Sequence, residues 1–376
     1  MSKRYSGKQI EKAGQILSES ADLEYAELSD QMDVLSFWRF CHEKPLYEAF
    51  NILQEVVSDY DKEAIYARRL KRTSSIVSKL RRFGRMSLKN MQDIGGCRAI
   101  VANEKKLQQI VRKLRKRREF KGNDGNVRSK DYLKRPKDDG YRSYHLVGKF
   151  KDGASSRSIE VQVRTLMQHY WATALEIVDI FTGQALKSNQ GDEEWSNFFR
   201  LVSEQFAAMD ELHLFHSLSD SAKHAKYLAK VKTSPALVKG VRDVQKISKK
   251  LGVKARLLAF TGSLDVINEK IDLNAGSGYF LLNIDLELGT VNVQRFERSD
   301  SREAESEYIS AEKTHAGNEK NLVALVSAAN IGDIKTAYPN FFADSKLFTD
   351  HLILIESIVV KRGVLESLLN SAPRLT

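Results

Sequence analysis

The sequence contains little cysteine and no long hydrophobic stretch, and both absences restrict the class of protein. Its two cysteines, Cys41 and Cys97, are too few for a disulfide framework or a four-cysteine zinc site. The N-terminus has no apolar signal core, and no apolar run is long enough to cross a bilayer. There is no internal repeat and no low-complexity segment. These absences predict a soluble, cytoplasmic protein without a membrane partner.

Positive charge is abundant and unevenly distributed. The chain has 376 residues, enough for two or three domains, and a formal net charge of +11. Lys and Arg gather in a first basic cluster at residues 68–89 and a second basic cluster at residues 112–137. Such clusters attract polyphosphate or nucleic acid, and the alternative is that they are solvated faces of helices.

Hydrophobic periodicity predicts the order of the elements. Helices are expected over residues 7–57, followed by a long basic helix over 61–83. A strand at 98–101, a basic helix at 103–118, an irregular polar segment, strands at 144–150 and 158–164 and a helix at 165–180 follow. This order predicts a small domain of the α+β class with a mixed sheet.

The second half of the chain is expected to be helical first and then mixed. Helices are predicted over 192–232 and 236–250. A hairpin of strands 279–286 and 290–296, a charged helix at 301–316, a strand at 321–326 and a helix at 345–357 predict a small α+β module.

Two acidic residues stand beside predicted strands. Asp93 precedes two glycines and the strand at 98–101, and Glu160 lies on the polar face of the strand at 158–164. Carboxylates on neighbouring strands would hold one Mg²⁺ against phosphate oxygens, because Mg²⁺ prefers hard oxygen ligands. Each acid alone is weak evidence, since an Asp before Gly is usually a turn residue and a Glu on an edge strand is usually solvated.

Cationic and aromatic side chains extend this pattern. Arg69, Lys71, Ser75 and Lys79 fall at helical spacing, so two ammonium groups and a hydroxyl on one helix face would grip a polyphosphate. The guanidinium groups of Arg69 and Arg98 are suited to stacking on a base. A further segment, residues 140–145, places an aromatic ring, a guanidinium, hydroxyl groups and an imidazole directly after a glycine.

Five separated motifs, in this order, make the chain resemble the RelA/SpoT synthetase domain over about residues 58–182. They are Arg69-x-Lys71-x-x-x-Ser75-x-x-x-Lys79, Asp93-Ile94-Gly95-Gly96-x-Arg98, Pro136-Lys137, Gly140-Tyr141-Arg142-Ser143-x-His145 and Glu160-x-Gln162-x-Arg164-Thr165. The resemblance implies a nucleotidyltransferase-like mixed sheet flanked by helices. Residues 1–57 are too short for a hydrolase domain and contain no His-Asp metal pair, so we expect a synthetase-only member.

The resemblance implies a pyrophosphokinase and assigns roles to individual residues. ATP would donate its β,γ-pyrophosphate to a ribose 3′-hydroxyl, and AMP would leave. By family analogy Arg69 and Arg98 sandwich the adenine, and Asp93 and Glu160 bind Mg²⁺. Tyr141 stacks on the acceptor base, and Glu160 also helps to deprotonate the attacking hydroxyl. The ATP phosphates would be held by Lys71, Ser75, Lys79 and Lys137. The acceptor or its phosphates would be oriented by His145 and Gln162.

Two positions after the last motif leave alternatives open. Many synthetases carry Glu four residues beyond the Trp, whereas here Glu176 comes five residues after Trp171, a shift of about 100° around a helix. His169 either faces the acceptor or packs at the start of a helix.

The C-terminal region resembles that of fused toxin–antitoxin proteins of the CapRel kind. The likeness lies in Tyr338-Pro339-Asn340-Phe341, after the hairpin and the charged helix. In that group a Tyr-x-x-Tyr element docks in the ATP site and silences the enzyme, so Tyr338 and Phe341 are predicted to be autoinhibitory. The alternative is that these aromatic side chains fill the module's own core or an oligomer interface.

The predicted organisation follows from these resemblances. It is an N-terminal helical segment (1–57), the synthetase domain (58–182), a helical connector (183–272) and an antitoxin-like regulatory module (273–376). An oligomer is left open.

The leading functional hypothesis is an autoinhibited growth-arrest toxin in phage defence, with Mg²⁺ as cofactor, ATP as donor and a phage protein as one candidate trigger. The basic clusters favour the tRNA 3′-CCA end as acceptor, because free nucleotides do not need so broad a positive surface. The alternative acceptor is GDP or GTP, which would give (p)ppGpp. Rival classes are a catalytically dead nucleotide-binding module and a structural RNA-binding protein.

Overall fold

The computed structural model describes residues 4–19, 28–84, 86–153, 155–182, 193–254, 257, 278–285, 290–315, 321–328 and 346–359. Within these ranges the chain begins with three helices, α1 (Gly7–Glu19), α2 (Ser29–Phe40) and α3 (Glu43–Ser58). A mixed segment follows: β1 (Ile65–Leu70), α4 (Thr73–Arg82), β2 (Gly95–Val101), α5 (Glu104–Leu114), β3 (Ser129–Asp131), β4 (Tyr144–Asp152) and β5 (Ser155–Thr165).

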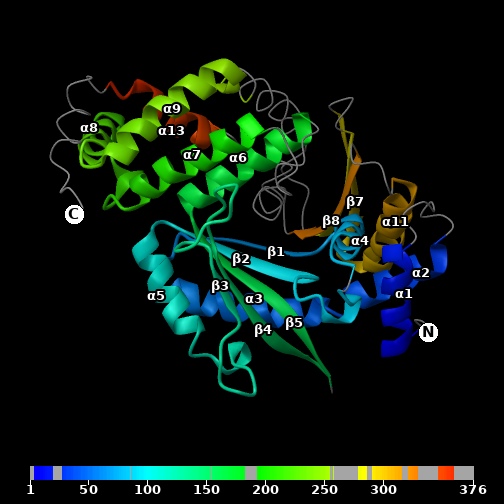
Figure 1. The fold of residues 1–376 in the computed structure, drawn as a ribbon. Coiled ribbons are helices and arrows are strands. Elements are labelled where there is room, and N and C mark those ends of the chain that lie inside the picture. Colours follow the sequence, from blue (N-terminus) through cyan, green and yellow to red (C-terminus); the bar gives the residue numbers. More distant parts are fainter. Residues whose placement is uncertain are drawn as a thin grey trace.

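The second half of the chain starts with helices and ends with a small sheet and two further helices (Figure 1). The helices are α6 (Leu166–Thr182), α7 (Glu193–Asp210), α8 (Asp220–Val231) and α9 (Pro235–Leu251). The later elements are β6 (Gly278–Asp285), β7 (Thr290–Glu297), α11 (Ser301–Thr314), β8 (Asn321–Ala328) and α13 (Lys346–Ser357). No helix in the described part of the chain has the length and apolar character needed to cross a membrane.

A five-stranded mixed sheet forms the centre of the first half, which confirms the predicted α+β class. Its strand order is β1-β2-β5-β4-β3. β2 and β5 run parallel, and the other neighbouring strands are antiparallel. α5 connects β2 to the later strands, as a parallel pair requires a crossover.

The predicted long basic helix over 61–83 is wrong, because its first part is the edge strand β1. Consecutive arginines hide the strand's alternation, but each points to a different face. Arg68 turns toward α3, where its guanidinium carbon lies 5.2 Å from the ring centroid of Tyr47 and 5.3 Å from that of Phe50. Arg69 turns to the opposite face, and the chain becomes helical only at Thr73.

The side of the sheet facing α3 and α5 is the apolar one. α5 is strongly amphipathic and is capped by the Asn103 side chain, which accepts a hydrogen bond from the Lys106 amide at 3.0 Å. Its buried face and that of α3 pack on alternate residues of the central strands. These buried strand residues are Cys97, Ala99, Val101, Leu146, Val161 and Val163.

A bundle of α6, α7, α8, α9 and α13 lies above the other side of the sheet in Figure 1. The expected single helix over 192–232 is wrong: it breaks after Asp210, where Leu214 has a left-handed φ of 54°, and resumes at Asp220. α9 begins at Pro235 with the Ser234 side chain as its cap and ends at Gly252, whose φ is 60°. Aromatic side chains from α6, α7 and α13 share one core, including Trp171, Trp195, Phe199, Phe206 and Phe348.

The predicted hairpin and charged helix of the C-terminal region are confirmed. β6 pairs with both β7 and β8 in an antiparallel sheet, and α11 covers it through a small core containing Leu281, Phe296 and Tyr308. α13, in contrast, buries Phe348 and Leu352 in the bundle. The domain boundaries proposed from the sequence remain a prediction.

Candidate active site

The register gathers many of the predicted site residues on the sheet face opposite α3 and α5. Side chains of directly paired residues lie on the same side of a sheet. Gly96 of β2 is paired with Arg69 of β1 and with Glu160 of β5. Two residues further along β2, Arg98 is paired with Gln162 of β5. β4 joins the same row through its pairing with β5. This face therefore carries Arg69, Arg98, His145, Glu160 and Gln162.

Asp93 lies between two ammonium groups directly before β2. Its Oδ2 atom is 3.2 Å from Lys71 Nζ and 2.8 Å from Lys79 Nζ. Burial alone would raise the pKa of Asp93, but the two ammonium groups outweigh it and hold the pKa below the usual value. The carboxylate is therefore ionised at neutral pH and holds both cations in place.

Lys71, Ser75 and Lys79 do not share one helix face, so that prediction is wrong. Lys71 precedes α4, and its amide donates to the Ile94 carbonyl at 2.7 Å, which ties the β1–α4 turn to the start of β2. Ser75 and Lys79 lie one turn apart on α4. The three side chains belong to one segment, but Asp93 and the sheet, rather than helical spacing, bring Lys71 to Lys79.

A chain of hydrogen bonds runs through the predicted acceptor residues. Tyr141 Oη lies 2.9 Å from His145 Nε2, and His145 Nδ1 lies 3.0 Å from Glu160 Oε1. Gln162 Nε2 donates to Glu160 Oε2 at 2.7 Å. Because an ionised carboxylate only accepts, His145 Nδ1 carries a proton and donates a hydrogen bond to Glu160.

The protonation states along this chain are fixed by burial and by charge. Burial would raise the pKa of Glu160, but the hydrogen bonds and charge of its surroundings, His145 foremost, lower it to about 2. Burial raises the pKa of Tyr141 to about 12. At neutral pH Glu160 is thus an anion, and the Tyr141 hydroxyl is neutral.

An aromatic cluster surrounds Tyr141, and sequence reasoning missed one of its members, Tyr132. The Tyr132 ring packs edge-on to those of Tyr141 and His145, with centroid distances of 5.8 and 5.1 Å. Lys137 Nζ lies 4.8 Å from the Tyr141 centroid and 5.3 Å from the Tyr132 centroid, and Trp171 lies on another side of Tyr141. Lys137, expected at the ATP phosphates, therefore lies beside Tyr141 and Tyr132. An isolated aromatic residue in a polar segment was the available signal for Tyr132.

Gly140 is required by both its conformation and its packing. Its φ is +92°, and a Cβ there would lie 2.9 Å from the Arg200 Cα and 3.0 Å from the Ser203 Cβ of α7. The Gly140 carbonyl accepts from the Ser203 hydroxyl at 2.5 Å, and Arg142 Nε donates to the same hydroxyl oxygen at 3.1 Å. The segment that carries Tyr141 thus rests directly on α7.

The residues present fit a divalent cation between Asp93 and Glu160. The two carboxylates are near enough for Glu160 to influence the pKa of Asp93, and the charge of Lys71 acts on both. Asp93 Oδ1 is buried and makes no hydrogen bond to any described residue, so one oxygen is left to bind a ligand. No group of three or more metal-ligating side chains occurs among the described residues, so water and substrate phosphates would have to complete the coordination of a Mg²⁺ ion there.

Arg164 and Thr165, at the end of β5, face buried partners. Arg164 Nη2 lies 2.5 Å from His169 Nδ1, and burial lowers the pKa of His169 well below its usual value. His169 is therefore neutral and buried, the packing alternative left open by the sequence. The Thr165 hydroxyl donates to Asp210 of α7, a carboxyl whose pKa burial raises to about 7.

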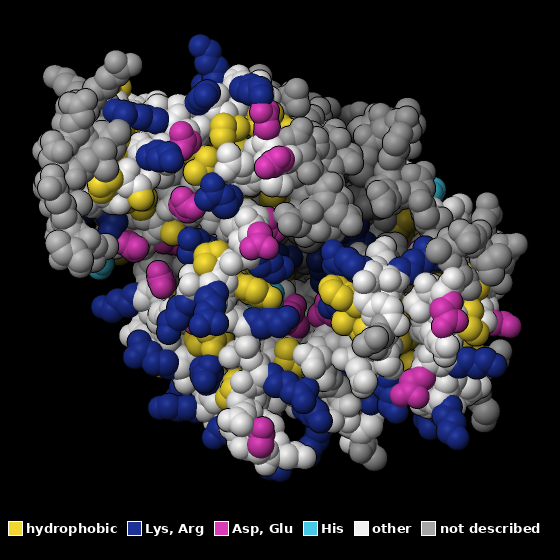
Figure 2. Space-filling view, in the orientation of Figure 1, with side chains coloured by type: hydrophobic (Ala, Val, Ile, Leu, Met, Phe, Trp, Pro, Cys, Tyr) yellow, Lys and Arg dark blue, Asp and Glu magenta, His cyan; other side chains and the backbone are white. Residues whose placement is uncertain are grey.

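The two basic clusters differ in exposure. In the first cluster, Arg69, Lys71 and Lys79 are half-buried against the site. In the second cluster, every Lys and Arg except Arg117 is exposed. Figure 2 shows these dark blue side chains on the left and lower part of the molecule, around α5 and β3. The second cluster, which ends at Lys137, therefore forms a positive surface that reaches the aromatic cluster.

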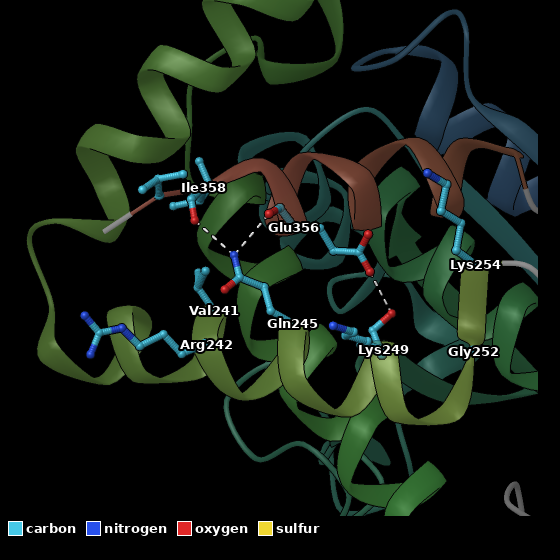
Figure 3. Close-up of a pocket in the computed structure, with 10 residues that line it drawn as sticks. Val241, Arg242, Gln245, Lys249, Gly252, Lys254, Glu356 and Ile358 are labelled. Carbon is cyan, nitrogen blue, oxygen red and sulfur yellow. Dashed lines mark hydrogen bonds between the residues drawn. The ribbon is translucent and has the colours of Figure 1, made fainter. Parts of the chain in front are cut away.

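A separate cavity of about 850 Å³ lies between α9 and the end of α13. Gln245 lines it and donates to the Ile358 carbonyl at 2.9 Å and the Glu356 carbonyl at 3.1 Å, closing the end of α13 (Figure 3). Its lining contains none of the predicted site residues. Tyr338 and Phe341, the predicted autoinhibitory pair, lie outside the described residues, as does the side chain of Glu176.

Comparisons with known proteins agree with the resemblance seen in the sequence. Residues 68–177 match the family described as "Region found in RelA / SpoT proteins". The GTP pyrophosphokinases YjbM and YwaC of Bacillus subtilis (strain 168) are both 32% identical, over 127 and 114 residues. These matches cover 32% and 28% of this chain and 58% and 52% of the relatives, so the chain spans little more than half the length of each.

Solved structures of this group are also similar to the chain. Small alarmone synthetase 1 from Bacillus subtilis bound to its product pppGpp is 25% identical, with a TM-score of 0.38, over 46% of this chain and 91% of that one. A GTP pyrophosphokinase family protein from Streptococcus pneumoniae is 24% identical, with a TM-score of 0.37, over 49% and 94%. The family match and the curated relatives support a RelA/SpoT-type synthetase domain around residues 68–177.

Proposed function

We propose that this protein is an ATP-dependent pyrophosphokinase. An acceptor 3′-oxygen attacks the β-phosphorus of ATP and forms a new O–P bond. The bond between that phosphorus and the oxygen bridging to the α-phosphorus breaks, AMP leaves with this oxygen, and the proton of the 3′-hydroxyl passes to solvent. The observation that carries the proposal is the gathering of Asp93, Lys71 and Lys79 beside the Glu160–His145–Tyr141 hydrogen-bond chain on one side of the sheet.

The donor half of the site is suited to a triphosphate. Lys71 and Lys79 neutralise phosphate charge, Ser75 supplies a hydroxyl donor, and transfer of this kind depends mainly on positioning and charge neutralisation. Asp93 and Glu160 would hold Mg²⁺, which supplies charge compensation on the transferred phosphates. Arg69 and Arg98 are proposed to stack on the adenine, and both lie on the same sheet face.

The acceptor half is suited to a base and a ribose. Tyr141 offers a ring for stacking, Lys137 a nearby cation, and His145 and Gln162 fixed hydrogen-bonding groups. A pKa of about 2 makes Glu160 a poor proton acceptor at neutral pH. This favours metal binding over general-base catalysis as its main role.

The proposed acceptor is the 3′-CCA end of tRNA. The exposed second basic cluster supports it, since a surface of this breadth suits a long polyanion. Modified tRNA would stop translation, which gives the proposed growth-arrest role in phage defence, with release by a phage protein and restraint by Tyr338 and Phe341. The second candidate acceptor is GDP or GTP, which the similarity to the GTP pyrophosphokinases YjbM and YwaC favours.

The test is to incubate the protein with ATP labelled in the γ-phosphate, together with tRNA, GDP or GTP, and to separate the products. We expect label at the tRNA 3′ end; label in a guanine nucleotide alone would transfer the proposal to the second acceptor. Asp93→Ala should lower the rate by roughly a hundredfold or more, whereas Asp59→Ala, which removes an exposed carboxyl at the end of α3, should leave it unchanged.

Two outcomes would exclude the enzyme. ATP binding without any transfer to the three acceptors would favour a nucleotide-binding module. RNA binding that weakens steeply with salt, without ATP turnover, would favour a structural RNA-binding protein.

A further inference from the structure

Arg39 of α2 joins two parts of the chain that are far apart in the sequence. Its side chain is buried, with 3% exposure, between α11 and the start of α4. On the α11 side, Nη2 donates to the Tyr308 hydroxyl at 2.7 Å, and Nη1 lies 3.8 Å from Glu312 Oε2. The guanidinium carbon also lies 5.2 Å from the Tyr308 ring centroid.

The same guanidinium holds the turn that carries Lys71. Arg39 Nε donates to the Lys71 carbonyl at 2.9 Å, and Nη1 donates to the Thr73 hydroxyl at 3.1 Å. Lys71 in turn places its ammonium 3.2 Å from Asp93. One rigid, planar group therefore spans from α11 to the residue that contacts Asp93.

Docking of α11 supplies partners for the hydrogen-bond donors and the charge of the Arg39 guanidinium. Glu312 is 10% exposed and is an acidic partner of the buried guanidinium, while the Tyr308 hydroxyl accepts one of its hydrogen bonds. Removing one partner of a buried charge pair is strongly unfavourable, because the remaining charge is left uncompensated. Without α11, Arg39 would turn toward water, and its bonds to Lys71 and Thr73 would weaken.

We propose that Arg39 is a positioning residue that couples the docking of α11 to the placement of Lys71, so that docked α11 strengthens ATP binding. The proposal rests on the proposed function for the identity of the ligand. Coupling is reciprocal, so ATP binding also strengthens the docking of α11. The C-terminal region thereby acts on the donor site through α11 and Arg39.

The chain offers a matched control on the same interface. Lys313 of α11 pairs with Asp33 of α2 at 3.0 Å, but the two side chains are 32% and 48% exposed. Lys313→Ala weakens the α11–α2 contact at the surface only. Tyr308→Phe keeps the buried ring and removes the hydroxyl that binds Arg39, and Glu312→Gln removes the compensating charge.

The kinetic test compares these three variants in the full-length protein. Tyr308→Phe and Glu312→Gln should each raise the KM for ATP by about fivefold or more, the lower end of typical coupling between sites, with little change in kcat. Lys313→Ala should stay within about twofold of the wild type, because half-exposed ion pairs contribute little. A KM for ATP that is unchanged in the folded Tyr308→Phe protein, or changed equally in Lys313→Ala, would overturn the proposal.

Hydrogen exchange supplies a readout that needs no turnover. Without nucleotide, amides of residues 71–77 should exchange faster in Tyr308→Phe than in Lys313→Ala. Adding a non-hydrolysable ATP analogue to the wild type should slow exchange in residues 301–314. If the wild type binds no nucleotide, the proposed function fails, and the exchange of residues 71–77 alone decides the coupling; equal exchange in the two variants refutes it.

Discussion

The buried carboxyl of Asp210 makes a quantitative prediction about pH and stability. Asp210 is 8% exposed on α7 and accepts a hydrogen bond from the Thr165 hydroxyl, while its Oδ1 atom has no partner among the described residues. Burial raises its pKa from 3.8 to about 7, although Thr165 and Arg142 oppose this. The folded protein therefore keeps this carboxyl protonated over a pH range in which the unfolded chain ionises it.

The sign and the size of the effect follow from this difference. Below pH 4 both states are protonated, and the stabilising effect of the proton is complete. Between pH 4 and about 7 the unfolded state binds fewer protons than the folded state, so the free energy of unfolding falls by about 1.4 kcal/mol per pH unit. The difference between the two pKa values, 3.8 and about 7, corresponds to a total loss of about 4 kcal/mol in the free energy of unfolding. Above about pH 7 this free energy falls no further through Asp210.

The assay is urea unfolding of the wild type and Asp210→Asn at pH 5 and pH 8, followed by the fluorescence of Trp171 and Trp195, which lie in the same core. Asn keeps an oxygen for Thr165 and cannot ionise. Between the two pH values the wild type should lose about 3 kcal/mol relative to the variant. Asp220→Asn, which removes a fully exposed carboxyl, should behave as the wild type. A difference between wild type and Asp210→Asn that does not depend on pH would refute the reasoning.

Two further substitutions test the segment that carries Gly140 and Tyr141. Gly140→Ala should lower the free energy of unfolding by more than Gly125→Ala. Both glycines have a positive φ, which costs an alanine about 1–3 kcal/mol of strain, but only Gly140→Ala would place a Cβ against α7. Equal losses in urea unfolding would contradict the packing argument. Tyr141→Phe keeps the stacking ring but removes the hydrogen bond to His145, so steady-state kinetics should show kcat lowered by roughly tenfold with the acceptor KM nearly unchanged; a raised KM with normal kcat would assign the hydroxyl to binding instead.

Residues that share a strand were predictable from the sequence, whereas partners brought together by packing were not. Alternation on β5 separates Glu160 and Gln162 from the apolar Val161, so their common face follows from the pattern. The strand β1 was missed because adjacent arginines obscure its alternation, and one of them is stabilised by aromatic rings of α3.

Contacts between distant segments could not be predicted from the sequence pattern. Arg39 and Tyr308 are 269 positions apart, and each looks like an ordinary residue of an amphipathic helix. Thr165 and Asp210 are likewise joined only when α7 packs against the end of β5. Local periodicity contains no information about such pairs, since they depend on how complete elements dock.

The contact between Gly140 and α7 has a consequence for protein engineering. The family match ends at residue 177, yet α7, from Glu193 to Asp210, supports the Gly140 segment, and its Phe199 carbonyl accepts from Trp171 Nε1 at 2.7 Å. A chimera that transplants the matched region alone would expose the side of the Gly140 segment that packs against α7. Any exchange of specificity between relatives should therefore transfer this helix together with the loop as one unit.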